Sequence, residues 1–266
     1  MFRRIIFILA FFFIPCLATA QQIVIPSGSQ MVIGSGSQIW NPVAAGGGVQ
    51  TPAQICGANL VVWYEAETAT CSGSCTNNAG VSGWTDKSAN ANNMGSGGGT
   101  VTYLTSQING KAAVYFNNGH FLFGSPIPWA SGQTVFIVSV NTSTAAKGDF
   151  VAGNTGSFKY WTAGSSKQQG ADVSSTAQIG LGTAAVDENW HQMNATYDGT
   201  TLAFRLDRAS DGGATNAQSV TASMDTIGAS HALSEPLYAE VAALVICNGS
   251  SYISGVETYL NSVYGK

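Results

Sequence analysis

From residue 58 onward, short apolar segments alternate with turn residues along the chain. The segments 60–64, 112–116, 134–140 and 241–246 are nearly continuous in apolar residues, which predicts strands buried in the middle of a sandwich. Gly, Asn, Asp or Ser bounds each segment. The pattern therefore predicts an all-β domain with many short strands.

Two segments of alternating polarity, 190–196 and 201–206, stand on either side of the dipeptide Asp198-Gly199. Glycine adopts positive φ readily, so Asp-Gly between two such segments predicts a tight β-hairpin.

One amphipathic helix is predicted near the C-terminus. Ile253, Val256, Leu260 and Val263 follow the 3.6-residue spacing, and Gly265 stands where a helix stops. A lone helix after many strands is expected to pack its apolar stripe on the edge of the sandwich.

The first twenty residues have the pattern of an export signal. Arg3 and Arg4 precede an apolar stretch at 5–14, and Ala18 and Ala20 form a small-x-small cleavage site. We therefore expect a signal peptide at 1–20 and a secreted protein, located outside the cell, in a periplasm or on the cell surface. The apolar stretch is shorter than the ~20 residues that span a bilayer, so no membrane span is predicted.

Residues 21–54 differ from the rest of the chain. Ser-Gly-Ser-Gln occurs at 27–30 and again at 35–38, which fits either two short strands joined by turns or an extended leader. A glycine-rich linker follows at 41–52. We expect one folded domain over 55–266.

Composition and charge argue against a nucleic-acid-binding protein and against a disordered one. Without Arg3 and Arg4, 8 of the 10 basic residues remain against 14 acidic residues, a net charge near −6. Nucleic acid is therefore not an expected partner, because phosphate binding needs clustered Lys and Arg. Aromatic residues make up 10% of the chain, which favours a folded protein over a disordered one.

Four cysteines remain after the expected signal cleavage: Cys56, Cys71, Cys75 and Cys247. An even number in an exported protein predicts two disulfides, and four cysteines allow three connectivities. A zinc site is less favoured, because no histidine accompanies the cysteines at ligand spacing.

Five segments together resemble the laminin-G-like branch of the concanavalin A-like lectin and glucanase superfamily. The similar segments are the opening strand at 60–67, the Trp-x-Asp-x-Ser loop at 84–88, the strand at 110–116, the Trp-His hairpin at 189–199, and the closing strand and helix at 240–265. The resemblance covers about residues 58–266 and implies a two-sheet antiparallel β-sandwich, or jelly roll, with one C-terminal helix.

The resemblance also implies that the first and last strands lie side by side in one sheet. It therefore pairs Cys56 with Cys247 and leaves Cys71 with Cys75 as a local clip.

The glucanases of this superfamily carry their catalytic carboxylates on a Glu-x-Asp-x-Glu strand, which this chain lacks. Its one acidic pair at i and i+2, Glu65 and Glu67, is interpreted as a solvated strand end. His191 is expected to be structural, and the glycine-rich segment 95–99 is expected to be a flexible loop. No catalytic residue is predicted, and the protein is not expected to be an enzyme.

Many relatives bind calcium through loop carboxylates and carbonyl groups, so the resemblance allows a structural calcium ion. This chain has loop acids but no dense acidic string that would identify the ligands. No metal-binding residue is therefore assigned. Asp86 is expected to cap its own turn by accepting from backbone amides.

Aromatic residues in loops are the candidates for ligand binding. Tyr160 and Trp161 stand between glycines with Lys and Gln nearby, and Trp129 follows two prolines. Sugar rings stack on such aromatic faces while amides bind the hydroxyl groups. The leading hypothesis is a non-catalytic module that binds carbohydrate or another cell-surface ligand. The alternatives are a structural or adhesive surface protein that contacts other proteins, and a glycoside hydrolase with an atypical carboxylate site.

Overall fold

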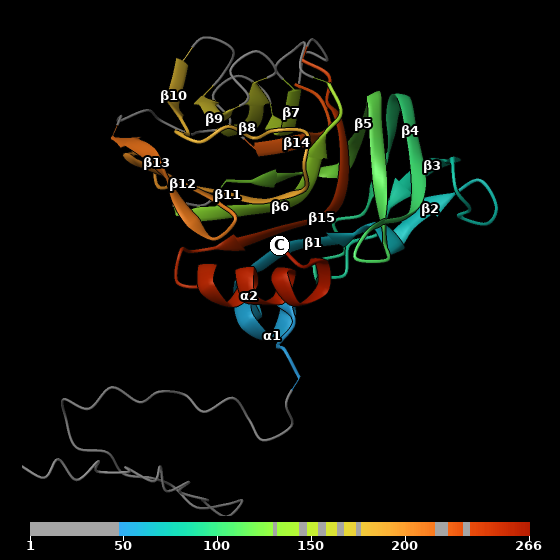
Figure 1. Cartoon of the computed structure of the whole chain (residues 1–266), viewed down its shortest axis with the longest axis horizontal. Coiled ribbons are helices and arrows are strands. Elements are labelled where there is room, and N and C mark those ends of the chain that lie inside the picture. The colour runs from blue at the N-terminus through green and yellow to red at the C-terminus, as the bar shows by residue number, and fades with distance from the viewer. Residues whose placement is uncertain are drawn as a thin grey trace, which may run out of the picture. The chain divides into compact units, whose positions relative to one another are not determined.

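The computed structural model describes residues 48–129, 132–143, 148–153, 158–163, 168–173, 177–215, 223–230 and 235–266. The expected signal peptide at 1–20, and the leader repeat at 27–38, lie outside the described residues. Within them the chain is all-β, as predicted, and its strands pair antiparallel (Figure 1).

The elements follow one another in this order: α1 (Pro52–Cys56), a 3₁₀ turn (Gly57–Asn59), β1 (Leu60–Glu65), a second 3₁₀ turn (Ala66–Thr68), β2 (Ala69–Cys71), β3 (Ala79–Trp84), β4 (Met94–Ile108), β5 (Lys111–Pro128), β6 (Gln133–Asn141), β7 (Gly148–Gly153), β8 (Phe158–Ala163), β9 (Gln168–Val173), β10 (Ala177–Leu181), β11 (His191–Tyr197), β12 (Thr201–Leu206), β13 (Ala209–Thr215), β14 (Ser223–Ile227), β15 (Tyr238–Asn248) and α2 (Ile253–Tyr264). Neither of these two α-helices is long and apolar enough to cross a bilayer, and the described residues contain no other candidate.

All the described strands are hydrogen-bonded into one sheet, whereas the jelly roll predicted from the sequence has two. The strand order is β10-β9-β8-β7-β14-β5-β15-β6-β11-β12-β13, with β1 on β15 and β2 to β4 attached through β5. The sheet is continuous because a long strand can pair with different partners along its length. β15 pairs with β5 up to Val241 and with β1 from Ala243, and a bulge separates the two stretches.

The two ends of this sheet approach each other. Gly180 on β10 lies so close to β12 and β13 that a Cβ atom there would come within 2.7 Å of Leu202 and 3.2 Å of Ala214. The amide of Thr183 donates to the carbonyl oxygen of Asp211 on β13 (3.0 Å). The sheet is therefore nearly closed and resembles a barrel.

The central strands β6 and β15 are buried on both faces, which explains their continuous apolar sequences. Val135 and Ile137 of β6 point into the main core, whereas Phe136 and Val138 point into a second core beneath α2. The C-terminal helix is confirmed, and it covers this second core with Val256, Tyr259, Leu260 and Tyr264 (Figure 1).

The predicted hairpin is also confirmed. β11 and β12 pair antiparallel, and Gly199 in their turn has φ +95°. Asp198 fixes the turn because its carboxylate accepts from the amides of Thr200 (2.9 Å) and Thr201 (2.7 Å).

Both expected disulfides are present, Cys56–Cys247 and Cys71–Cys75. The first joins the end of α1 to the end of β15, next to the pairing of β1 with β15.

The glycine-rich segment 95–99 is part of strand β4, so the prediction of a loop there was wrong. A Cβ on Gly97 would overlap the ring of His120, and one on Gly99 would overlap the backbone of Asn118 on β5. The glycines thus allow β4 to lie close against β5, which a longer side chain would prevent.

Candidate functional site

The outer edge of β1 is covered by side chains of the loop between β3 and β4 instead of by another strand. Asp86 accepts from the amides of Trp63 (2.9 Å), Ser88 (2.8 Å) and Asn92 (2.9 Å). Trp84 Nε1 donates to the carbonyl oxygen of Glu65 (2.7 Å). The predicted role of Asp86 as a turn cap is confirmed, and the Trp-x-Asp-x-Ser motif joins this loop to β1.

Two asparagines of the same loop complete this edge. Asn90 Nδ2 donates to the carbonyl oxygens of Leu60 (2.7 Å) and Val61 (3.0 Å), and Asn92 Nδ2 donates to Val61 (2.9 Å). These hydrogen bonds replace those that a neighbouring strand would make, and they hold the two asparagines in fixed positions beside β1.

A pocket of about 430 Å³ opens next to these asparagines. Its walls come from the start of β1, the β3–β4 loop, the end of β5 with Trp129, the start of β6 and the end of β15. The volume falls in the range of about 300–1,000 Å³ that is usual for small-molecule sites. Its polar side chains are Asn90, Asn92, Ser125, Gln133 and Asn248.

The end of β5 presents Trp129 to this pocket. Pro126 and Pro128 are exposed and line the pocket, while Ile127 between them is buried. Proline fixes its own φ and keeps the preceding residue extended. The two prolines on either side of Ile127 therefore keep this segment extended. The half-buried Trp129, one of the predicted binding residues, therefore does line a pocket.

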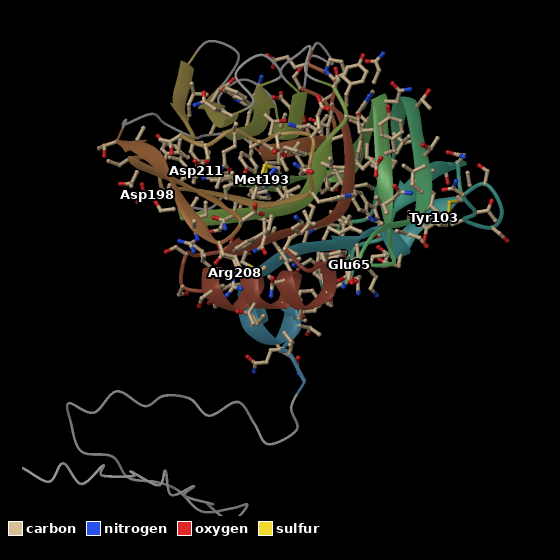
Figure 2. All side chains as sticks on the ribbon, in the orientation of Figure 1. Glu65, Tyr103, Met193, Asp198, Arg208 and Asp211 are labelled. Carbon is tan, nitrogen blue, oxygen red and sulfur yellow. A yellow bond between two sulfur atoms is a disulfide. The ribbon has the colours of Figure 1, made fainter. Side chains whose placement is uncertain are left out.

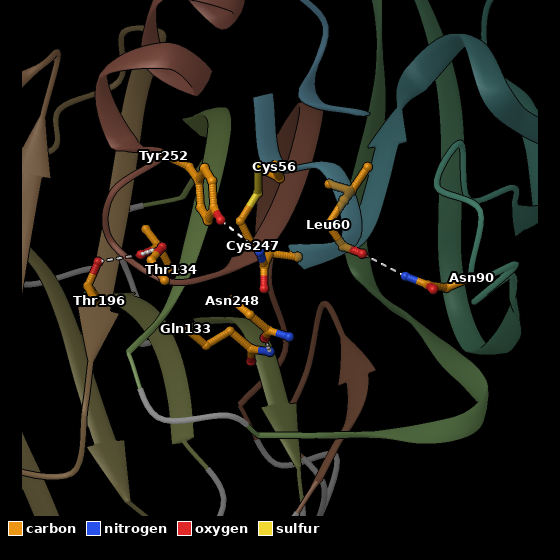
Figure 3. Close-up of a disulfide and its surroundings, with 11 residues drawn as sticks. Cys56, Leu60, Asn90, Gln133, Thr134, Thr196, Cys247, Asn248 and Tyr252 are labelled. Atoms are coloured by element: carbon orange, nitrogen blue, oxygen red, sulfur yellow. Dashed lines mark hydrogen bonds between the residues drawn. A yellow bond between two sulfur atoms is a disulfide. The ribbon is translucent and has the colours of Figure 1, made fainter. Parts of the chain in front are cut away.

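An amide pair forms the opposite wall. Gln133 Nε2 donates to Asn248 Oδ1 (2.8 Å), one residue beyond the Cys56–Cys247 disulfide (Figure 3). Gln133 is 0% exposed, and its Oε1 atom has no hydrogen-bond partner. The amino-acid sequence alone does not identify Asn90, Asn92, Gln133 and Asn248 as a site, because asparagine and glutamine are common throughout this chain and only the fold brings these four together.

Tyr160 and Trp161, the other predicted binding residues, are buried, with 0% and 4% exposure. They are adjacent on β8 and therefore point to opposite faces. Tyr160 stacks on Phe204 in the main core, and its hydroxyl donates to Gln169 (2.5 Å). Trp161 Nε1 donates to the carboxylate of Asp172. Neither ring offers a face to a ligand, so the structure does not support the predicted role.

The structure places Glu65 and Glu67 in different contacts. Glu65 is labelled in Figure 2. Its buried carboxylate accepts from Tyr259 of α2 (2.5 Å) and pairs with Lys87. Glu67 is exposed and lies 3.9 Å from Lys111. Glu65 is thus a structural tie between β1 and α2, which corrects its interpretation as a solvated strand end.

His191 lies between two carboxylates, with Nδ1 2.8 Å from Asp207 Oδ2 and Nε2 3.0 Å from Asp187 Oδ1. The hydrogen bond to Asp207 raises the pKa of His191, and partial burial opposes this rise. The hydrogen bond from His191 also lowers the pKa of Asp187 to about 2. None of the three residues lines the pocket.

In the part of the chain that the structure describes, no group of three or more acidic, histidine or cysteine side chains is arranged to hold a metal ion. Asp149 and Asp172 lie on strands, and Asp86 and Asp211 are engaged by backbone amides. No ligands for a structural calcium ion can therefore be assigned among these residues.

No family model and no curated protein sequence matches this chain. Among solved structures, domain 4 of AbnA, a GH43 extracellular arabinanase from Geobacillus stearothermophilus in complex with arabinotriose, is similar with a TM-score of 0.58 and 12% identity. The match covers 75% of this chain and 97% of that domain.

Two further solved structures are similar at lower identity. A GH54 α-L-arabinofuranosidase has a TM-score of 0.62 at 9% identity, and the match covers 81% of this chain and 66% of that one. A botulinum neurotoxin type C structure, whose cell entry depends on two ganglioside molecules, has a TM-score of 0.54 at 7% identity, with coverage of 78% and 52%. At these identities the matches show a shared β-rich fold that occurs in carbohydrate-binding domains and in glycosidases.

Proposed function

We propose that this protein is a secreted, non-catalytic carbohydrate-binding domain and that the pocket beside Trp129 is its binding site. The observation that carries the proposal is the combination of one half-buried tryptophan with five uncharged polar side chains around a pocket of about 430 Å³. Two of these polar groups, Asn90 and Asn92, are held in place by hydrogen bonds to β1.

This combination suits the chemistry of a sugar. A pyranose or furanose ring has an apolar C–H face that packs on an aromatic ring, while its hydroxyl groups need both donors and acceptors. Trp129 supplies the aromatic surface, and the amides of Asn90, Asn92 and Asn248 supply the polar partners. Groups that are already oriented by the fold lose little entropy on binding.

The structural neighbours support this class of ligand. Nearly the whole of AbnA domain 4, which was solved with arabinotriose, is matched by this chain. Because the neighbours also include glycosidases, the fold alone does not separate binding from catalysis. We also propose that the two disulfides reflect export, as the predicted signal peptide implies, and that the nearly closed sheet is a variant of the concanavalin A-like jelly roll.

The pocket lining supports binding without hydrolysis. A retaining glycosidase needs two carboxyl groups about 5–5.5 Å apart. None of the described residues that line this pocket carries a carboxylate. We therefore propose that a sugar bound here remains intact.

Measured binding to a glycan array, followed by calorimetry on the strongest ligand, tests the proposal. Trp129→Ala is expected to weaken binding about five- to a hundredfold, because stacking of a planar ligand face on one aromatic ring contributes on the order of 1–3 kcal/mol. Trp190→Ala is the matched control, since Trp190 is also half-buried but lies outside the pocket. Equal weakening by both variants, or no glycan binding by the natural protein, would contradict the proposal.

The hydrolase alternative has its best support on another face of the sheet. The carboxylates of Asp149 and Asp172 are buried on β7 and β9, on either side of β8. Release of reducing sugar from a polysaccharide, abolished in Asp149→Asn or Asp172→Asn and unaffected in Trp129→Ala, would favour this alternative. The adhesive alternative would instead give a silent array together with a specific protein partner.

A further inference from the structure

The hydrogen-bond inventory of the pocket specifies which kind of glycan it accepts. Asn90 and Asn92 use their Nδ2 groups on the carbonyl oxygens of β1. No hydrogen-bond donor among the described residues reaches the Oδ1 atom of either side chain. This wall of the pocket therefore offers two acceptors, Asn90 Oδ1 and Asn92 Oδ1, together with the second N–H of Asn92.

The opposite wall offers a donor. Asn248 Oδ1 already accepts from Gln133 Nε2, so the Nδ2 group of Asn248 is left to a ligand. If the oxygen and nitrogen of both amides exchanged places, the pair would still retain one unused acceptor and unused donor capacity. The pocket thus has one wall with two amide acceptors and another wall that holds the Asn248 donor together with the unpartnered acceptor Gln133 Oε1.

Charge is missing from both walls. The described lining residues include no Lys, Arg, His, Asp or Glu, and the mature chain is expected to be acidic overall. A carboxylate transferred from water into such a pocket would lose hydration without gaining a cation. It would also lie close to the two asparagine acceptors, which repel it.

We propose that the pocket selects neutral sugars and rejects those that carry a carboxylate, such as uronic acids and sialic acid. This selectivity rests on the proposed carbohydrate binding and specifies its ligand class. The hydroxyl groups of a neutral sugar donate to Asn90 and Asn92 and accept from Asn248, whereas a carboxylate can only accept.

Matched pairs of oligosaccharides test the selectivity. The pairs are galactotriose with trigalacturonic acid and lactose with 3′-sialyllactose, included on an array of neutral and acidic glycans and then measured by calorimetry at low salt. The acidic member of each bound pair is expected to bind at least about tenfold more weakly than the neutral member. Equal or tighter binding of the acidic members would overturn the selectivity while leaving carbohydrate binding intact. A completely silent array would contradict the proposed function itself, and the selectivity with it.

A single added cation should reduce the preference. Ser125 is exposed and lines the pocket, and its side chain takes part in no hydrogen bond among the residues that the structure describes. Ser125→Lys is expected to strengthen binding of the acidic members about three- to tenfold at low salt, and the gain should shrink as salt is added. Neutral members should change less than about twofold.

Ser210→Lys on β13 is the matched control, because it adds the same charge at an exposed serine outside the pocket. A gain of similar size in both variants would show that the overall charge of the protein, and not the lining of this pocket, disfavours acidic glycans, and the proposal would fail.

Discussion

Two tryptophans with similar sequence surroundings occupy different environments in this fold. Trp129 and Trp161 both lie near glycines and polar residues, yet Trp129 is half-buried in an open pocket and Trp161 is 4% exposed. The difference arises because Trp129 follows the last residue of a strand, whereas Trp161 lies within β8, which pairs with β7 on one side and β9 on the other. The position of an aromatic residue relative to the strand end, more than its neighbours in sequence, decides whether it can meet a ligand.

The two regions are also held together differently. The pocket region is tied covalently by the Cys56–Cys247 disulfide, and Cys247 directly precedes the pocket residue Asn248. The region around β8 has instead a buried polar network, in which Tyr160 donates to Gln169 and Gln169 donates to Asp211 (2.5 Å). Asp211, which is labelled in Figure 2, lies on β13, and its carboxylate also accepts from Thr183 and Ala184.

The largest effect is expected from removing the covalent tie. Cys56→Ala combined with Cys247→Ala opens a loop of sequence separation 191 and should lower the free energy of unfolding by up to about 5 kcal/mol in the chain-entropy model. Urea denaturation monitored by tryptophan fluorescence measures the change. The matched pair Cys71→Ala and Cys75→Ala, with a separation of 4, should lose only about 2 kcal/mol. A larger loss from the short clip would show that the long disulfide does not hold the pocket region.

Truncating the two aromatic sites should separate stability from binding. Tyr160→Ala leaves a cavity in the main core and is expected to cost about 3–5 kcal/mol of unfolding free energy. Trp129→Ala should cost less, because its ring is only half-buried. If urea denaturation shows Trp129→Ala to be the more destabilising variant, the contrast between a binding residue and a core residue is wrong.

A smaller change tests the polar network alone. Tyr160→Phe keeps the ring and removes the hydroxyl group that donates to Gln169 Oε1. The acceptor is then left buried without a partner, which should lower the free energy of unfolding by about 1–3 kcal/mol. Glycan affinity, measured by calorimetry on the same variant, should be unchanged, because none of these residues lines the pocket.

The smallest effect is expected from pH. The pKa of His191 is raised in the folded state, so its contribution to stability is fully present below about pH 6.5 and is lost as the pH rises through the raised value. His191→Gln should remove this part of the pH dependence in denaturation curves recorded from pH 6 to 8. Over the same range glycan affinity should stay constant, since no titratable residue is among the described pocket lining.

Local patterns were sufficient to predict several elements. The Asp198-Gly199 hairpin, the helix α2 and the all-β class depend on short-range signals that the fold preserves. The Cys56–Cys247 pairing was also predicted correctly, but it depended on the family resemblance, because four cysteines alone leave three connectivities open.

The features that were missed depend on long-range contacts. The glycine-rich segment at 95–99 predicts a loop in the sequence alone, because its fit against His120 and Asn118 becomes visible only when β4 meets β5. The amides of the pocket come from the β3–β4 loop, β6 and β15. No spacing rule in a single sequence identifies such a set, and the continuity of the sheet through β15 is likewise a tertiary property.

The asparagine side chains that cover the outer edge of β1 have a consequence for how these molecules behave when they are crowded. An open strand edge is a template on which a second chain can add its own strand, and this is a common route to aggregation. Here the carbonyl groups of Leu60 and Val61 are already occupied by Asn90 and Asn92. We therefore expect the same side chains that shape the pocket to keep neighbouring copies from joining their sheets at this edge.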